Sequence, residues 1–219
     1  MKKILYSVAL AACCMGTMTS CSDFLDASNK SNETAKQSFA TKEGLNNLVN
    51  DAYQHLQNVY AAPLFTSCFS AGTDMYADAR NKMNEALNTY ETLTPENTDI
   101  KNLYTYLYSG IRAANSVSYY AQTAQVDDKT KSQLIGEARV LAAYEYYLLV
   151  NNFGGVPIMK DFLTTADTGY PKSSPEDVYA YIISELEEVI SKNVLQASTA
   201  TKGGGRIASQ IGRAVQQEC

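Results

Sequence analysis

The chain has 219 residues, 45% of them apolar and 19% charged, and a formal net charge of -5. This length and balance are typical of a folded protein with one good-sized domain, and they exclude a chain that is disordered throughout. The acidic charge also disfavours nucleic acid as a partner, because nucleic acids bind basic surfaces.

The first twenty residues are typical of an export signal. Lys2 and Lys3 precede an uncharged, mostly apolar stretch, ILYSVALAACCMGTM, which has the length of a signal-peptide core and is shorter than the ~20 residues of a membrane-spanning helix. Two small residues and a cysteine follow at 19–21, and this pattern resembles the cleavage site of bacterial lipoproteins. The resemblance implies that residues 1–20 are removed and that Cys21 carries a lipid anchor such as palmitate. The alternative is a conventional signal peptide with Cys21 as an ordinary thiol.

Removal of residues 1–20 changes both the cysteine count and the charge. Cys13 and Cys14 are lost, so that Cys21, Cys68 and Cys219 remain, and two lysines leave without any acid, which takes the formal net charge from -5 to -7. With Cys21 lipidated, no disulfide framework remains. A pair between Cys68 and Cys219 is arithmetically possible, but we expect Cys68 to be a small buried hydrophobic side chain.

Residues 21–40 are polar with scattered Phe and Leu, and we expect a tether that leads to a helical domain over 41–200. The first helix begins after Thr41, a residue type favoured as an N-cap. Its apolar residues recur at the spacing of one helix face: Leu45, Leu48, Val49, Ala52, Tyr53, Leu56 and Val59. Residues 61–98 lack such a period and contain Pro63, Gly72 and Pro95, so we expect mostly loop with short helical turns.

Three more helices follow, over about 99–123, 128–152 and 174–190. The second of these must end before the sequence FGGVP at 153–157, because two glycines and a proline cannot continue it. The last has the clearest start, since Ser174 can cap the helix, Pro175 suits its first position and Asp177 its third. The predicted buried stripes are Leu103, Leu107, Ile111, Ala114 and Val117, then Leu134, Ala138, Leu141, Glu145 and Leu148, then Val178, Tyr179, Ile182, Leu186, Val189 and Ile190.

Four helices joined in places by short loops predict an all-α fold of antiparallel helical pairs. Tyrosine-rich pairs with small residues at the crossing points are compatible with tetratricopeptide-like stacking, although the ~34-residue period of such repeats is not visible. The sequence GVPIM at 155–159 could form a short extended segment, and no substantial sheet is predicted.

The residues that carry chemistry do not form a catalytic constellation. His55 is the only histidine, and a single histidine does not make a metal site without unusual partners, so we expect it to lie at the surface or at a cap. No cysteine pair has zinc spacing, and neither a phosphate-binding glycine loop nor a nucleophile elbow occurs. The adjacent acids at 127–128 and 187–188 are better explained as capping or solvated charges than as a glycosidase pair. We therefore predict a protein that is not an enzyme and uses no cofactor or metal.

Tyrosine is the distinctive residue, with 16 Tyr, 6 Phe and no Trp. A tyrosine ring can stack on a sugar ring while its hydroxyl bonds the edge. Most helical tyrosines, among them Tyr104, Tyr108, Tyr144 and Tyr147, are expected to be core or helix-crossing contacts. Loop tyrosines are better candidates, because binding residues concentrate on loops held by a rigid scaffold. The predicted ligand-binding residues are therefore Tyr76 and Tyr90 with the polar neighbours Asp74, Asp78, Arg80 and Asn81, and the alternative is a polar loop with incidental aromatics.

Four stretches together resemble the SusD/RagB family of Bacteroidetes outer-membrane lipoproteins. They are CSDFLD at 21–26, LYTYLYSGIRAANSV at 103–117, GEARVLAAYEYYLLVNNFGGVPI at 136–158 and SSPEDVYAYIISELEEVI at 173–190. The resemblance implies a helical protein with tetratricopeptide-like repeats, anchored by lipid on the outer face of the outer membrane. It also implies a binding protein, not an enzyme, that captures nutrients, commonly oligosaccharides, and caps a TonB-dependent transporter of the SusC type.

Two departures from the family pattern stand out. Ala142 stands where the family usually has arginine, so one charged contact on that helix is expected to be absent. Members of the family are more than twice as long, and the sequence from Gly205 and Arg206 starts like the family's next helix before it departs from the pattern. We therefore expect an incomplete SusD-like domain over 41–200, a divergent tail over 201–219, and a truncated or frameshifted reading frame. An alternative from another class is a helical-repeat lipoprotein that binds only its transporter and has no ligand site of its own.

Overall fold

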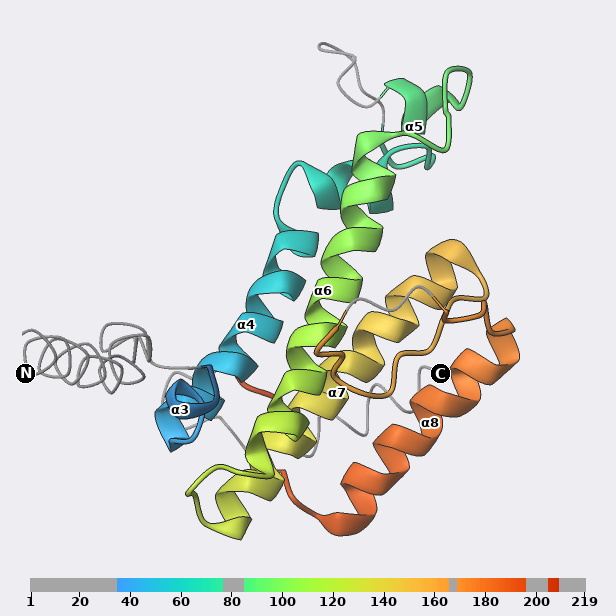
Figure 1. Ribbon diagram of the computed structural model, residues 1–219. Helices are drawn as coiled ribbons and strands as arrows, with labels where there is room; N and C mark the ends of the chain where they lie inside the picture. Colours follow the sequence, from blue (N-terminus) through green and yellow to red (C-terminus); the bar gives the residue numbers. More distant parts are fainter. Residues whose placement is uncertain (1–34, 77–84, 166–168, 196–204, 209–219) are drawn as a thin grey trace, which may run out of the picture. The chain divides into compact units, whose positions relative to one another are not determined.

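The computed structural model describes residues 35–76, 85–165, 169–195 and 205–208 (Figure 1). Within these residues four long helices carry the fold: α4 (Lys42–Tyr60), α6 (Thr98–Ala121), α7 (Asp128–Phe153) and α8 (Pro175–Lys192). Three short elements accompany them: α3 (Ala35–Ser38), the π-helix η1 (Thr66–Ser70) and α5 (Glu85–Thr89). The described residues contain no strand, so the prediction of an all-α fold is confirmed.

Each long helix is preceded by a residue whose side chain accepts a hydrogen bond from a backbone N–H of the first turn. Thr41 accepts a hydrogen bond from the Gly44 amide at 3.0 Å, and Ser174 accepts one from the Asp177 amide at 3.1 Å, as the sequence predicts. Asn97 and Asp127 cap α6 and α7 in the same way. Because these polar residues cannot continue the apolar stripe and favour caps, they fix where the helices begin.

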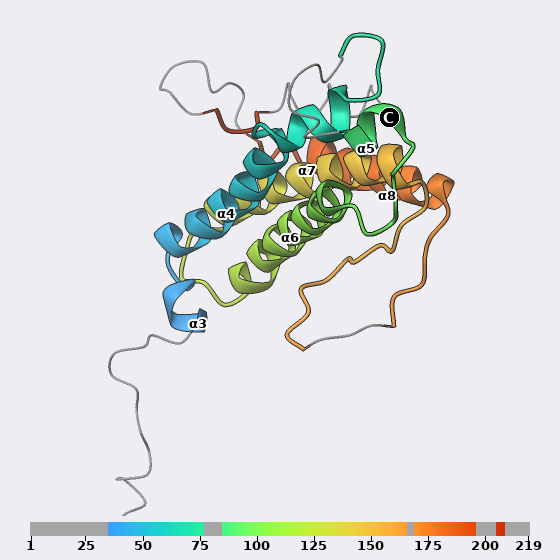
Figure 2. The same ribbon diagram turned by 90° about the horizontal axis from the view of Figure 1, so that it is seen from above.

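The long helices form antiparallel neighbours in chain order. α6 packs against both α4 and α7, α4 also contacts α7, and α8 packs against α7. Figures 1 and 2 show this arrangement from two directions, with each helix running opposite to the one before it. The pairing agrees with the predicted tetratricopeptide-like stacking. Every helix in the described residues is too short or too polar to cross a bilayer.

The predicted stripes form the core. Nearly all their members are buried, and Tyr53, Leu56, Tyr179 and Ile190 are only half-buried because they lie at the edges of their stripes. Cys68 is half-buried and packs against the core, where burial raises the pKa of its thiol to about 11. It is a free cysteine, and Cys219 lies outside the described residues.

The folded part extends beyond the helical domain that we expected at 41–200. Phe39, placed by the sequence in the tether, packs on Tyr120 with ring centroids 4.8 Å apart, and the Gln125 amide donates to the Ala40 carbonyl at 2.8 Å. Residues 205–208, placed in the divergent tail, also contact the helices. Composition alone did not indicate either segment, because a few contacts with distant residues fix each of them.

Arg206 holds the segment 205–208 against α4 and α7. Its Nε donates to Glu137 at 2.8 Å, and its Nη1 donates to Asn46 at 2.6 Å. The Tyr53 hydroxyl donates to the same Glu137 oxygen at 2.6 Å and accepts from the Ile207 amide at 2.8 Å. These bonds satisfy a nearly buried carboxylate and join residues that lie far apart in the sequence.

One position of the α7 stripe is a fully buried carboxyl group. Glu145 is 0% exposed, and neither of its oxygens has a hydrogen-bond partner among the described residues. It packs against Gly110 of α6, where a Cβ atom would come within 1.7 Å of Glu145 Oε1. Burial raises the pKa of this carboxyl well above its usual value, because desolvation disfavours the ionised form.

Candidate functional site

Two of the loops that the sequence predicts as ligand-binding lie against each other. Residues 71–76 follow η1, and residues 88–93 end α5 and continue beyond it. The Tyr90 hydroxyl donates to the Gly72 carbonyl at 3.3 Å, and the Gly72 amide donates to the Asn88 side chain at 3.4 Å. Tyr90 has a positive φ of 62° and remains 59% exposed. We call residues 71–76 and 85–93 the loop surface.

The structure describes only part of the predicted ligand-binding set. Tyr90 and Asp74 are exposed and Tyr76 is half-exposed, and all three belong to the loop surface. The contact between Tyr90 and Gly72 brings the two loops together, two residues before Asp74 in the chain. Asp78, Arg80 and Asn81 lie outside the described residues, as does Cys21. The ligand-binding role of this set stays a prediction.

An aromatic cluster that the sequence analysis missed precedes the loop surface. Tyr60, at the end of α4, is 42% exposed, and Phe65 is 38% exposed. The rings of Tyr60 and Phe69 are nearly parallel, with an angle of 9° between their planes and centroids 6.4 Å apart. The Tyr60 hydroxyl bonds the hydroxyl of Tyr144 on α7. The cluster therefore exposes aromatic rings at the surface, and the hydrogen bond to Tyr144 holds the Tyr60 ring in place.

Three helical side chains hold the segment after α7 against α6 and α7. The Tyr108 hydroxyl donates to the Pro157 carbonyl at 2.7 Å, and Asn115 Nδ2 donates to the Met159 carbonyl at 2.8 Å. The Tyr146 hydroxyl accepts from the Met159 amide at 2.7 Å. The prediction that helical tyrosines such as Tyr108 act as core or crossing contacts is confirmed, because all four that it named pack against the core, and Tyr146, which it did not name, acts in the same way. These bonds position the residues that follow, up to Thr165.

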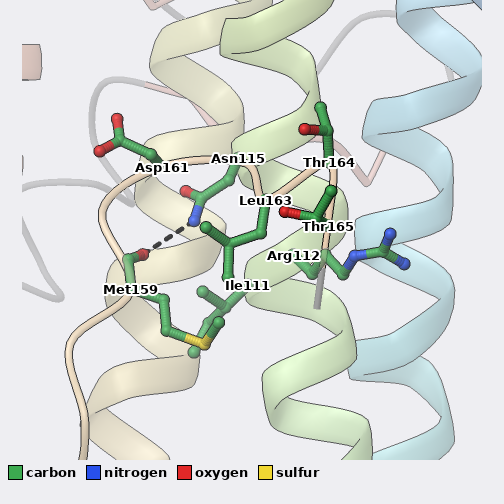
Figure 3. Close-up of a pocket in the computed structure, with 8 residues that line it drawn as sticks. All are labelled: Ile111, Arg112, Asn115, Met159, Asp161, Leu163, Thr164 and Thr165. Atoms are coloured by element: carbon green, nitrogen blue, oxygen red, sulfur yellow. Dashed lines mark hydrogen bonds between the residues drawn. The ribbon is translucent and has the colours of Figure 1, made fainter. Parts of the chain in front are cut away.

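The first cavity lies between α6 and this segment and has a volume of about 370 Å³ (Figure 3). Three residues of α6 and five of the segment line it: Ile111, Arg112, Asn115, Met159, Asp161, Leu163, Thr164 and Thr165. Figure 3 shows Arg112 extending toward α4 and away from Asp161. The cavity is thus apolar at its centre and carries charged and hydroxyl groups at its edges.

The second cavity lies between α4 and α6 and has a volume of about 400 Å³. Arg112 lines it too, together with Asp51, His55 and Phe162. The Arg112 guanidinium lies 5.3 Å from the centroid of the Phe162 ring, and the His55 ring lies 3.8 Å from the Asp51 carboxylate. His55, expected at the surface or a cap, is half-buried at this cavity.

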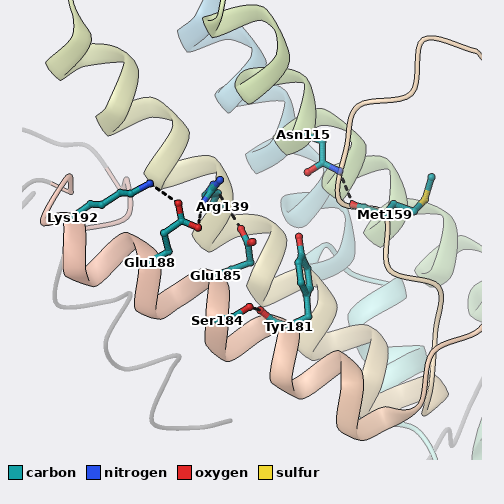
Figure 4. A network of polar contacts seen from close by, with 8 residues as sticks. All are labelled: Asn115, Arg139, Met159, Tyr181, Ser184, Glu185, Glu188 and Lys192. Carbon is teal, nitrogen blue, oxygen red and sulfur yellow. Dashed lines mark hydrogen bonds and ion pairs between the residues drawn. The ribbon is translucent and has the colours of Figure 1, made fainter.

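A third cavity, of about 330 Å³, lies between α6, α7 and α8 beside a network of ion pairs (Figure 4). Arg139 of α7 lies 3.6 Å from Glu185 and 2.6 Å from Glu188, both on α8. Burial raises the pKa of Glu185, whereas hydrogen bonds from Lys192 and Arg139 lower the pKa of Glu188. Ala142, which stands where the sequence analysis expected an arginine, lines this cavity. The network joins α7 to α8, and both carboxylate oxygens of Glu188 have a cationic partner.

The sequence analysis did not single out Arg112, Asp161 or Phe162. They come together only because the segment after α7 turns back onto α6, and no local pattern indicates that return. Two features of the sequence could have indicated that the segment returns to α6. One is the amide side chain of Asn115 among apolar residues, and the other is the FGGVP stop that ends α7. Among the described residues no group of three or more His, Cys, Asp or Glu side chains could hold a metal ion.

Comparison with known proteins identifies the fold and the family. Residues 23–201 match the SusD-like family that is described as starch-binding and associating with the outer membrane. A SusD-like protein of Formosa agariphila is 28% identical over 190 residues, which cover 84% of this chain and 36% of that protein. The family description is one of binding, in agreement with the prediction that the chain is not an enzyme.

Solved structures show the same fold. Surface glycan-binding protein A from Bacteroides uniformis has a TM-score of 0.68 and 25% identity, over 80% of this chain and 41% of that one. Surface glycan-binding protein A from Bacteroides thetaiotaomicron, solved in complex with laminarihexaose, has a TM-score of 0.65 and 22% identity, over 81% of this chain and 38% of that one. This chain spans only a little over a third of these relatives' length. Helix order, fold and sequence match agree, and the chain belongs to the SusD-like family.

Proposed function

We propose that this chain belongs to a lipid-anchored protein that captures oligosaccharides at the outer membrane and delivers them to a SusC-like TonB-dependent transporter. The family match supports association with the outer membrane. The relative from Bacteroides thetaiotaomicron was solved with laminarihexaose bound, and another structural neighbour is a laminarin-binding SusD-like protein. Capture is non-covalent, because stacking and hydrogen bonding suffice to hold a sugar and no catalytic constellation is predicted.

The exposed Tyr90 is the observation that carries the proposal. The residue is 59% exposed, yet its hydroxyl donates to the Gly72 carbonyl and its backbone amide donates to the Ala86 carbonyl at 3.1 Å. A ring held in this way loses little conformational entropy when a sugar stacks on it. Asp74 and Tyr76 on the adjoining loop are the proposed partners for the sugar hydroxyls, with Asp78, Arg80 and Asn81 of the same stretch.

Calorimetric titration with laminarihexaose tests this role. We expect the wild-type chain to bind and Tyr90→Ala to weaken binding about tenfold or more, because one stacking aromatic contributes roughly 1–3 kcal/mol in comparable stacked sites. Tyr119→Ala is the matched control, since Tyr119 is a 43% exposed tyrosine that lies on α6 and not on the loop surface. Equal affinities for Tyr90→Ala and wild type would remove Tyr90 from the site.

The anchor and the transporter need separate experiments. Metabolic labelling with palmitate is expected to mark the wild-type chain in its native host and not Cys21→Ala; label that survives in Cys21→Ala would contradict the anchor at this residue. Co-purification of a SusC-like transporter is expected with or without added glycan. If the transporter co-purifies and no glycan of a broad panel binds, the chain is an interaction module instead.

A further inference from the structure

We propose that Arg112 forms a second sugar site on α6, separate from the loop surface, that takes an anionic sugar unit bearing a carboxylate or a sulfate. The inference rests on the proposed role in glycan capture. It adds that one sugar unit of the glycan is negatively charged. It follows from the position of one cation between two cavities.

Arg112 is held in place without an acidic partner. Its guanidinium lies over the Phe162 ring, 5.3 Å from the centroid, and it makes no ion pair with any described residue. By contrast, Arg139 and Arg206 each pair with glutamate. A guanidinium stacked on an aromatic ring keeps its N–H groups free at the edge of the plane, where they can bond two oxygens of one anion.

The acids that line the two cavities do not neutralise this charge. Asp161 lies on the other side of the first cavity, and Arg112 extends away from it (Figure 3). Asp51 lies 3.8 Å from His55 in the second cavity. The unpaired positive charge therefore stands out in a chain whose formal net charge is -5.

The surroundings of Arg112 suit a sugar. The cavities on its two sides have volumes of about 370 and 400 Å³, within the roughly 300–1,000 Å³ range of small-molecule sites. Thr164 and Thr165 supply hydroxyls at the first cavity. The Phe162 ring, which lines the second cavity, supplies an aromatic face. Aromatic faces and hydroxyl groups contact the sugar ring, and the guanidinium selects its anionic substituent.

Calorimetry with three probes tests the site: trigalacturonate for the carboxylate, a sulfated carrageenan tetrasaccharide for the sulfate, and laminarihexaose as the neutral sugar. We expect the wild type to bind at least one anionic probe, with an affinity that falls as salt is raised. Arg112→Met should weaken that binding about tenfold to a hundredfold, as for the loss of a charge-assisted hydrogen bond. Arg112→Lys should lie between the two, because lysine keeps the charge and loses the planar fork.

Lys129→Met is the matched control, because Lys129 is an exposed cation at the start of α7 and the charge change is the same. It should bind the anionic probes as wild type does, and none of the Arg112 variants should alter binding of laminarihexaose. Failure to bind either anionic probe, or equal affinities for Arg112→Met and Lys129→Met, would overturn the inference. Loss of laminarihexaose binding in Tyr90→Ala, with anionic binding intact, would separate this site from the loop surface.

Discussion

We predict that Glu145→Gln removes a pH dependence from the stability of the fold. Glu145 is fully buried beside Gly110, and its pKa in the folded chain is raised by that burial. In the unfolded chain the same carboxyl ionises above about pH 4.3. Because the folded-state pKa is the higher one, ionisation of this group costs no stability below the unfolded pKa, and stability falls as the pH rises toward the folded pKa.

The size of the effect follows from one proton that the folded chain keeps and the unfolded chain releases. In that range the free energy of unfolding falls by up to about 1.4 kcal/mol for each pH unit. Over one pH unit in that range this amounts to a decrease of up to roughly 3–6 °C in Tm for a chain of this size. Glutamine has no such proton, so Glu145→Gln should lack this part of the slope. Glu145→Leu should also be more stable than Glu145→Gln by about 1–3 kcal/mol, because it buries no unpaired polar group.

Urea unfolding followed by circular dichroism at several pH values measures this slope. Other carboxyls also titrate, among them Glu185, so the informative quantity is the difference between wild type and variant. Glu187→Gln on the exposed face of α8 is the control, and it should keep the wild-type slope. If Glu145→Gln keeps the wild-type slope as well, the carboxyl is ionised in the folded chain and the argument from burial fails.

Three further substitutions test how the scaffold is held together. Tyr146→Phe removes the hydrogen bonds to Met159 and should lower the free energy of unfolding by about 1–3 kcal/mol in denaturant unfolding; no change would show that the Tyr146 hydroxyl does not help to hold this segment. Arg206→Met leaves Glu137 with only the Tyr53 bond and should cost about 2 kcal/mol or more, with faster hydrogen exchange at Ile207; unchanged exchange would show that the segment does not depend on Arg206. Ser174→Ala removes the cap of α8 and should cost about 1 kcal/mol by thermal unfolding, whereas Ser174→Asp, which can still cap, should cost less.

The sequence predicted the long helices because their signals are local. The Ser174 and Thr41 caps and the stripe along α6 each depend on residues within a few turns, and the structure places them as expected. The FGGVP stop is equally local, and Gly154 ends α7 with a φ of 69°. Periodicity also placed Glu145 in a buried stripe, but it could not show that the carboxyl would face Gly110 without a partner.

The parts that the sequence missed depend on contacts between distant residues. Arg206 bonds Glu137 and Asn46, which lie 69 and 160 residues away in the chain. Phe162 meets Arg112 only because Tyr108, Asn115 and Tyr146 hold the intervening segment on α6 and α7. Tyrosine content suggested a sugar-binding surface, and loop position pointed to Tyr90, but neither could indicate the cavities on α6.

Hydrogen–deuterium exchange with and without laminarihexaose tests the central claim most directly, because it locates glycan binding without any substitution. The account predicts that saturating laminarihexaose slows exchange in residues 71–76 and 85–93, the loop surface, and leaves α8 unchanged. No change at a saturating concentration, or protection confined to helices away from these loops, would contradict the proposal that the loop surface binds the glycan.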